Sequence, residues 1–232
     1  MGSTESPGIK GIELSKPAST TALGSMRSQG VSFAIVRGYR STSTVDPNLA
    51  ANVANAWAAG MAHVDVYHTP SFSSGNPARQ VNALVNYLKV NNVKYGQMWL
   101  NIEGPGAYWG DDTAANADFI AELFNEMRSN GVHLGIRTSA SQWEPIAGSW
   151  TGGSAYPLWY KQTDSKQTFD DFTPFGGWTK PNIKTYDEGE LAGVGVERLW
   201  YLRPQQIPRI APPTRSRHGR TATADRGRPP GG

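Results

Sequence analysis

One alternation, repeated between residues 11 and 140, constrains the fold more than any other feature of this sequence. Short runs rich in valine and isoleucine recur at intervals of about 30 residues, which is the size of a strand–helix–strand unit. Their shortness and β-branched content are typical of buried parallel strands. The runs are Gly11–Leu14, Ser32–Arg37, Ala62–Tyr67, Gln97–Ile102 and His133–Thr138.

The segments between these runs are predicted to be helices. Asp46-Pro47 has the pattern of a helix N-cap followed by proline at the first helical position. Gln80–Lys89 and Asp112–Asn130 each place their apolar residues on one helical face. Glycines that can end a helix in the left-handed conformation stand at positions 30, 60 and 131.

The pattern changes after residue 140, where helical periodicity fades and glycine, proline and aromatic residues become frequent. Three apolar runs remain there, at Pro157–Tyr160, Ile183–Tyr186 and Val194–Tyr201. Consecutive strand–helix units form a parallel sheet, which is either open or closed. We predict the closed form: an α/β fold of the irregular TIM-like (β/α) barrel type, with five βα units followed by three strands with few helices.

The two ends of the chain differ in composition from the rest. Residues 203–232 are rich in Arg, Pro and Gly and hold seven arginines and one aspartate, so residues 1–202 carry a net charge of −3. We expect disorder in residues 1–8 and 203–232 and a barrel domain over residues 9–202. The basic pI of about 9.1 therefore reflects the tail. We expect no nucleic-acid partner, with binding through the tail as the alternative.

Several classes of protein are excluded. The chain has no cysteine, so a disulfide framework, a thiol nucleophile and a thiolate metal site are impossible. The four histidines show no metal-ligand spacing with acids, and we expect neither a metal nor another cofactor. No apolar run approaches the roughly 20 residues of a membrane helix, so we expect no membrane partner. The first ten residues lack the apolar stretch of a signal peptide, which leaves the compartment undetermined.

Reacting groups of parallel barrels gather where strands end, at the carboxyl face. Asn101 and Glu103 are two residues apart on one strand and should point into one site. The apolar residues before Glu103 favour a protonated carboxyl, as a general acid requires, although a strand-end salt bridge fits equally well. The other candidates at strand ends are Glu13, Arg37, Tyr39, Asp65, Tyr67, Arg137, Trp159, Tyr160, Tyr186 and Glu197.

Glu13 and Glu197 would lie on the first and last strands, which are neighbours in a closed barrel. Two carboxyl groups, or one carboxyl and a substrate amide, are what glycoside hydrolysis needs. An exposed surface acid is the alternative for both, and the favoured one for Glu197 beside Arg198. The aromatic residues after position 142 suit a glycan groove, but we expect more than half of them to pack the barrel.

Several long runs, in order, resemble the animal branch of the family 25 glycoside hydrolases between about Gly11 and Tyr201. The runs are SFAIVR at 32–37, AWAAGMAHVDVY at 56–67, SASQWEPI at 139–146, GSWTGG at 148–153, PLWY at 157–160 and FGGWTKP at 175–181. The resemblance implies a lysozyme that cleaves the β-1,4 bond between N-acetylmuramic acid and N-acetylglucosamine in bacterial peptidoglycan. It also implies secretion and a role in antibacterial defence. We expect a monomer.

The acidic residues depart from the pattern of that family, which has aspartate at the positions of Glu13, Asn101 and Glu197. Only Glu103, the general acid that the resemblance implies, matches outright. Asn101 lacks the charge that stabilises a developing cation, and Arg137 stands where the family usually has tyrosine and favours an ionised Glu103. The resemblance thus implies a hydrolase of weakened activity, assisted by Glu13 or Glu197. The alternative is an inactive homologue that binds peptidoglycan.

Overall fold

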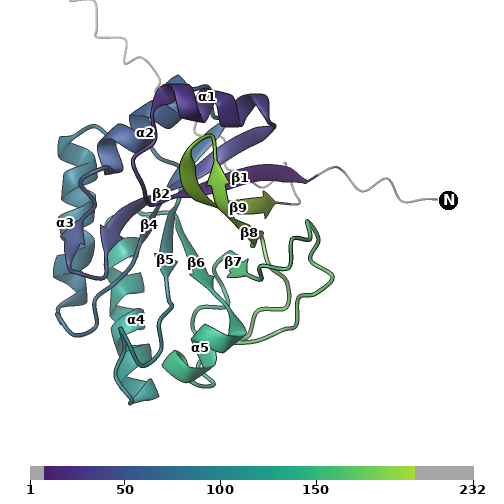
Figure 1. The fold of residues 1–232 in the computed structure, drawn as a ribbon. Helices are drawn as coiled ribbons and strands as arrows, with labels where there is room; N and C mark the ends of the chain where they lie inside the picture. The colour runs from purple at the N-terminus through teal and green to yellow at the C-terminus, as the bar shows by residue number, and fades with distance from the viewer. Residues whose placement is uncertain (1–7, 202–232) are drawn as a thin grey trace, which may run out of the picture.

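The computed structural model describes residues 8–201, and its core is a closed eight-stranded barrel (Figure 1). The expectations for residues 1–7 and 203–232, including nucleic-acid binding by the tail, lie outside the described residues. The barrel strands are β1 (Ile9–Leu14), β2 (Val31–Arg40), β4 (His63–His68), β5 (Met98–Asn101), β6 (Leu134–Thr138), β7 (Leu158–Lys161), β8 (Ile183–Leu191) and β9 (Val194–Tyr201).

Pairing between β1 and β2 closes the ring. Neighbouring strands are parallel from β1 round to β8, whereas β9 runs antiparallel to both β8 and β1. The short strand β3 (Thr44–Val45) pairs with the end of β2 and lies outside the ring. The predicted barrel of five βα units and three further strands is confirmed.

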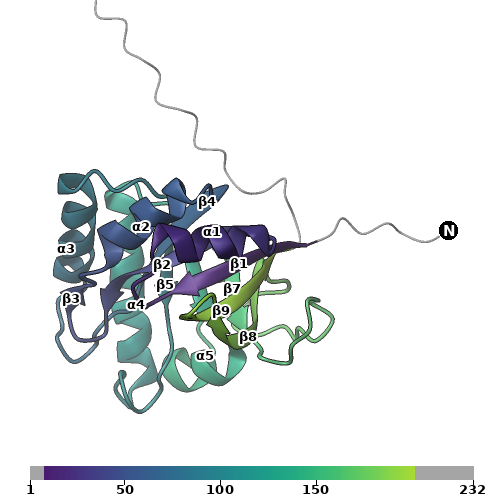
Figure 2. The ribbon, with the colours of Figure 1, turned by 45° about the horizontal axis from the view of Figure 1, so that its top comes forward.

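Five helices in the described part of the chain cover the outside of the barrel (Figures 1 and 2). The carboxylate of Asp112 caps α4 by accepting hydrogen bonds from the backbone of Ala114 and Ala115. The predicted left-handed glycines are confirmed, with φ of 93°, 82° and 70° at positions 30, 60 and 131. The helices are α1 (Thr20–Ser28), α2 (Leu49–Ala58), α3 (Pro77–Val90), α4 (Thr113–Ser129) and α5 (Ala140–Ala147).

The predicted helix start at Asp46-Pro47 is wrong, because α2 begins at Leu49. The Asp46 carboxylate accepts hydrogen bonds from the side chains of Arg37, at 2.6 Å, and Arg40, at 3.2 Å. These ion pairs, together with a bond from the backbone of Asn48, hold the carboxylate in a turn before the helix. Charge-assisted hydrogen bonds of this kind are strong, so the two arginines, and not the first turn of a helix, fix the position of the carboxylate.

The barrel is filled by large side chains up to a level just below its carboxyl face. Tyr67, Trp99 and Trp159 form the top of this filling, with the Trp99 and Trp159 rings edge to face at 5.9 Å. A larger apolar layer lies between the barrel and the helices. Because successive residues of a strand face opposite sides, the next inward positions above the tryptophans are Asn101 and Lys161. They begin a polar floor at the mouth of the barrel.

Most of the aromatic residues after position 142 pack the structure, as expected. Trp150, Tyr156 and Phe172 are partly buried, and six others are buried: Trp143, Trp159, Tyr160, Phe175, Trp178 and Tyr186. Trp143 and Trp178 meet edge to face at 4.9 Å. Gly176 adopts φ of 53° against these two rings, where a Cβ atom would come within 2.9 Å of both. Glycine is therefore required at this close approach.

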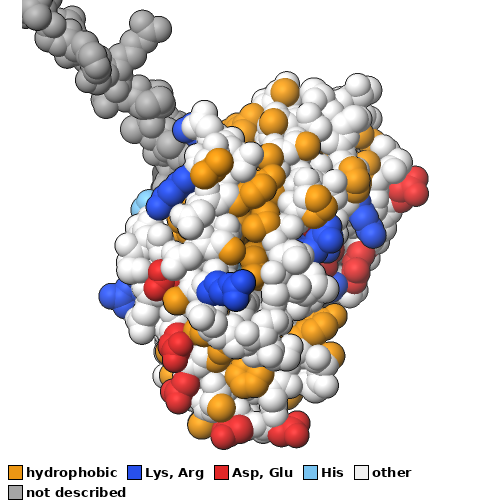
Figure 3. Space-filling view, turned by 90° about the vertical axis from the view of Figure 1, so that its left-hand side faces the viewer, with side chains coloured by type: hydrophobic (Ala, Val, Ile, Leu, Met, Phe, Trp, Pro, Cys, Tyr) orange, Lys and Arg blue, Asp and Glu red, His pale blue; other side chains and the backbone are white. Residues whose placement is uncertain are grey.

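On the side where α3 lies, apolar side chains form a stripe and acidic side chains gather at one end (Figure 3). Exposed apolar side chains are ordinary on a protein surface, so the stripe by itself indicates no binding site. Within residues 8–201, no helix is long and apolar enough to span a membrane.

Candidate active site at the mouth of the barrel

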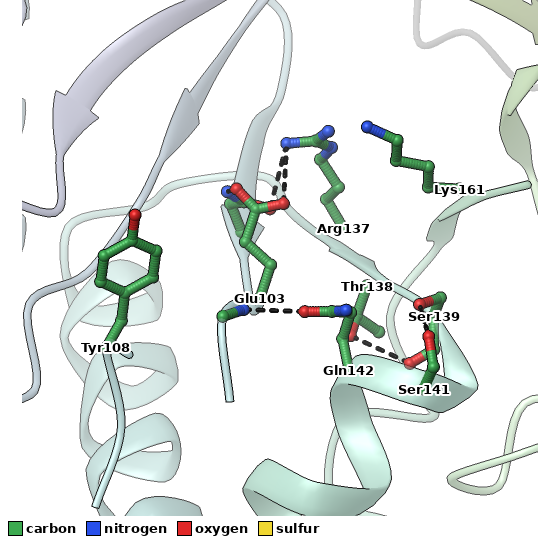
Figure 4. Close-up of a pocket in the computed structure, with 10 residues that line it drawn as sticks. Glu103, Tyr108, Arg137, Thr138, Ser139, Ser141, Gln142 and Lys161 are labelled. Atoms are coloured by element: carbon green, nitrogen blue, oxygen red, sulfur yellow. Dashed lines mark hydrogen bonds and ion pairs between the residues drawn. The ribbon is translucent and has the colours of Figure 1, made fainter. Parts of the chain in front are cut away.

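A cavity of about 400 Å³ opens at the carboxyl ends of β5, β6 and β7 (Figure 4). Its walls come from these strands, from the loop after β5 and from the start of α5, and most of its side chains are polar. It is lined by Asn101, Glu103, Gly104, Tyr108, Arg137, Thr138, Ser139, Ser141, Gln142 and Lys161.

Arg137 occupies the centre of the site, pointing inward from β6. Its Nη2 atom donates to both carboxylate oxygens of Glu197, at 2.8 and 2.7 Å. Its Nη1 atom lies 3.5 Å from Glu103 Oε2 and 3.3 Å from Asn101 Oδ1. The guanidinium stacks over the Trp159 ring, 4.7 Å from the ring centre. The prediction that Arg137 places a cation beside Glu103 is confirmed.

The charges around Arg137 decide its ionisation. Burial alone lowers the pKa of Arg137, but the carboxylates of Glu197 and Glu103 outweigh this cost and raise its pKa. The guanidinium is consequently a permanent cation at the centre of the cavity. A buried cation of this kind is stable only while its carboxylate partners remain in place.

Glu197 lies inside the site, so the interpretation as a surface acid is wrong. Its side chain is 16% exposed and faces the barrel interior from β9. Besides Arg137, it accepts hydrogen bonds from Lys161 Nζ and Thr185 Oγ1, both at 3.1 Å. Burial raises the pKa of Glu197, but Arg137 and Lys161 outweigh burial and lower it. Glu197 is a carboxylate that two resident cations already neutralise.

Glu13 stands directly opposite Glu197 in the β1–β9 pairing, which confirms that the two acids are neighbours. It is buried and accepts a hydrogen bond of 2.5 Å from the Tyr67 hydroxyl. Burial, and then the charge of Glu197, raise the pKa of Glu13 to about 7. Near neutral pH this carboxyl is therefore only partly ionised, and it is sealed beneath the floor of the cavity.

Glu103 is the acid that reaches the cavity. Its side chain is 38% exposed, and its Oε1 atom accepts a hydrogen bond of 2.6 Å from Asn101 Nδ2, so these two residues do share one site. The adjacent Gly104 N–H donates to Gln142 Oε1 at 2.8 Å, which fixes the loop (Figure 4). The expected apolar surroundings of Glu103 are wrong, because its neighbours are an amide, a guanidinium and solvent.

Some of the predicted substrate contacts lie lower in the barrel or at its rim. Asp65 is buried below Tyr67, where it accepts hydrogen bonds from Trp99 Nε1, at 2.9 Å, and from the backbone of Gln97. Arg37 is held at the rim by its ion pair with Asp46. Asp65 thus orients the side chains that fill the barrel. Two of the predicted substrate contacts, Tyr67 and Trp159, instead form the floor under Arg137.

Three tyrosines that were predicted to contact substrate do not line the cavity that holds Glu103. The pairing register of β2 shifts between Arg37 and Tyr39, and Tyr39 packs in the outer layer against His68, with ring centres 4.6 Å apart. Tyr160 also belongs to the outer layer and donates to Asp171 Oδ1 at 2.9 Å. Tyr186 is buried next to Thr185, whose side chain faces inward to Glu197.

Sequence reasoning missed two residues that hold Glu197. Lys161 follows Trp159 by two positions on β7, and Thr185 follows Ile183 by two on β8. The period of two that placed Asn101 before Glu103 would have placed both residues inside the barrel. In the described part of the chain, no group of three or more acids and histidines is arranged to hold a metal ion.

The chain is similar to known lysozymes along most of its length. The family model "Lysozyme-like protein 1" matches residues 5–186. Probable GH family 25 lysozyme 4 of Dictyostelium discoideum is 47% identical over 194 residues, which cover 83% of this chain and 90% of that protein. Lysozyme-like protein 5 of Caenorhabditis elegans is 34% identical over 189 residues, covering 80% and 87%.

Solved structures support the fold. A family GH25 lysozyme from Aspergillus fumigatus superposes with a TM-score of 0.70 at 18% identity, covering 85% of this chain and 95% of that one. A bacterial lysozyme from Streptomyces coelicolor gives 0.68 at 23% identity, covering 86% and 95%. At these identities the likeness concerns the barrel itself.

Proposed function

Because the chain belongs to the family 25 lysozymes of the glycoside hydrolases, we propose that it cleaves bacterial peptidoglycan at the β-1,4 bond between N-acetylmuramic acid and N-acetylglucosamine. In this proposal the protein acts as a monomer on a glycan strand lying in the cavity. Glu103 donates a proton to the oxygen of the leaving sugar, and the acetamido group of the substrate assists on the other side of the bond.

The observation that carries the proposal is the position of Glu103. Of the three acids in the predicted catalytic set, it alone lines the cavity, while Glu13 and Glu197 lie behind it. A proton donor must come within hydrogen-bond distance of the bond it breaks. Asn101 fixes the Glu103 carboxyl by its hydrogen bond and leaves the other carboxylate oxygen facing Arg137.

The same contacts limit the rate that we expect. Asn101 has no charge to stabilise the cation that develops on the sugar, and loss of one such partner costs on the order of 10²–10³ in rate. Glu197 cannot replace it, because its charge is neutralised by Arg137 and Lys161. We therefore propose a slow hydrolase.

A wall-clearing assay tests this function. The fall in turbidity of a bacterial wall suspension is followed with the wild type, Glu103→Gln and Glu122→Gln, the last being an exposed acid on α4 that serves as the matched control. We expect slow clearing by the wild type and the control and none by Glu103→Gln. If Glu103→Gln clears walls at the wild-type rate, Glu103 is not the general acid and the proposal is wrong.

The contact of Arg137 Nη2 with both carboxylate oxygens of Glu197 favours a second candidate, a homologue that binds the glycan without cleaving it. In that case the wild type is retained on insoluble peptidoglycan but clears no walls. Asn101→Asp, which returns one negative charge beside Glu103, should then gain measurable clearing. Retention without clearing distinguishes this candidate from the hydrolase, and the absence of both refutes the two together.

A further inference from the structure

The peptide group that joins Glu103 to Gly104 lies just beyond the end of a barrel strand. Strand β5 ends at Asn101, and Gly104 turns the chain away from the barrel with a φ of 77°. A side chain at this glycine would collide with Tyr108, because a Cβ atom there would lie 2.2 Å from Tyr108 Cδ2. A peptide group in such a turn needs partners outside the sheet for its N–H and its carbonyl oxygen.

Both polar atoms of this peptide group have a side-chain partner. The carbonyl oxygen of Glu103 accepts a hydrogen bond from Trp109 Nε1 at 3.0 Å. The Gly104 N–H donates to Gln142 Oε1 at 2.8 Å, as Figure 4 shows. Because the two bonds act on opposite edges of one rigid planar unit, they fix its orientation. The direction in which the Glu103 side chain leaves the backbone is fixed with it.

The indole ring that donates to Glu103 is held in place by packing. Trp109 is buried and contacts the rings of Phe72 and Phe119, with ring centres 5.9 and 6.1 Å away. Phe72 follows β4, and Phe119 lies on α4. Since closely packed side chains have little room to move, the Trp109 N–H is a donor at a fixed point.

A buried asparagine ties the two partners of the peptide group to each other. Asn116 on α4 is completely buried, and its Nδ2 atom donates to the carbonyl oxygens of Gly110, at 2.8 Å, and Ile146, at 2.9 Å. Its Oδ1 atom accepts from the Gly110 N–H at 3.2 Å. Gly110 directly follows Trp109, and Ile146 lies on α5, the helix that carries Gln142. The donor and the acceptor around the peptide group are thus anchored to one helix.

We propose that Trp109 and Gln142 are positioning residues for the general acid, which aim the Glu103 carboxyl through its backbone. The inference rests on the proposed function, because it concerns how the acid of that reaction is placed. A general acid contributes about 10²–10⁴ in rate and acts only within hydrogen-bond distance of the atom that it protonates. A displacement of about 1 Å can cost about 100-fold. Loss of either bond should therefore slow proton donation and leave glycan binding in place.

Two aryl glycosides of the N-acetylglucosamine–N-acetylmuramic acid disaccharide separate proton donation from binding. A dinitrophenyl group leaves as a stable anion and needs no proton, whereas a methylphenyl group leaves slowly unless an acid protonates its oxygen. The ratio kcat/KM reports every step up to the departure of the aryl group. A loss of binding or of folded protein lowers this ratio equally for both glycosides, and a misplaced acid lowers it for the methylphenyl glycoside alone.

The variants are Trp109→Phe, which removes the donor, and Gln142→Met, which removes the acceptor. The matched control is Trp57→Phe, because Trp57 Nε1 also donates to a backbone oxygen, that of Lys94 at 2.8 Å, in the segment before β5. Thermal unfolding verifies that each variant is folded. Gln142 is only partly buried, so Gln142→Met carries the test if Trp109→Phe does not fold.

We expect Trp109→Phe and Gln142→Met to lower kcat/KM at least about tenfold for the methylphenyl glycoside. For the dinitrophenyl glycoside both variants should stay within about twofold of the wild type, as Trp57→Phe should for both substrates. An equal loss on the two glycosides, or no loss on either, would overturn the positioning role and leave the proposed function intact. Cleavage of neither glycoside by the wild type would overturn both proposals.

Discussion

Glu197→Gln should destabilise the protein far more than Arg137→Met, although the two residues form one pair. Glu197→Gln removes the nearest carboxylate from the buried guanidinium and leaves it with the Asn101 oxygen at 3.3 Å, the Glu103 carboxylate at 3.5 Å and the Trp159 ring below it. An uncompensated buried charge of this kind costs about 3–5 kcal/mol. Arg137→Met leaves Glu197 with its hydrogen bonds from Lys161 and Thr185, so we expect a loss of only about 2 kcal/mol, near the lower end of core substitutions.

The double variant separates this explanation from a simple loss of packing. With Arg137→Met already in place, Glu197→Gln no longer strands a cation, so the double variant should be more stable than Glu197→Gln alone by about 1–2 kcal/mol. Urea unfolding followed by tryptophan fluorescence measures all three. Glu188→Gln is the matched control, because this exposed acid also pairs with Lys161 but not with Arg137. A Glu197→Gln variant as stable as the control would refute the reasoning.

Two further predictions concern pH. Burial lowers the pKa of His68 from 6.5 to about 3. Below pH 6.5 the unfolded chain therefore binds a proton at His68 and the folded protein does not, so the free energy of unfolding falls as the pH drops below 6.5. Thermal unfolding should show that the stability of His68→Leu relative to the wild type rises by about 2 kcal/mol when the pH is lowered from 6.5 to 5. The same stability difference at both pH values would contradict this. For Glu13, whose pKa is raised from 4.5 to about 7, the folded protein keeps a proton that the unfolded chain releases, so stability is lost as the pH rises through this range. Urea midpoints at pH 5 and 8 should fall less for Glu13→Gln than for the wild type, and parallel midpoints would show that Glu13 does not titrate in this way.

The strands and the contacts across the mouth of the barrel could be predicted because they follow from short periodicities. The period of two placed Asn101 and Glu103 together, and the order of the strands made Glu13 and Glu197 neighbours. Tyr39 was misplaced because a shift in strand pairing leaves no mark in hydrophobicity. A run of apolar residues along the chain does not report what lies across the barrel, where distant strands supply the partners.

The aspartate at position 46 shows the same limit at short range. Its sequence context, an acid followed by proline, matched a helix cap, and a local rule could not include the two arginines that bind it. Charge–charge contacts are decided by the tertiary structure. A local preference worth about 1 kcal/mol therefore gives way whenever such contacts compete with it.

The contact between Asn101 and Arg137 limits what restoring the acid at position 101 can achieve. An aspartate there would have a carboxylate oxygen about where Asn101 Oδ1 now lies, 3.3 Å from Arg137 Nη1, and would form an ion pair with it. Its charge would then be shared with the guanidinium instead of acting on the sugar. Asn101→Asp combined with Arg137→Tyr should consequently clear bacterial walls at least tenfold faster than Asn101→Asp alone, a difference of about 1.4 kcal/mol in the barrier. Equal rates for the single and double variants would mean that Arg137 does not neutralise this position, and the charge argument for the slow rate would fail with it.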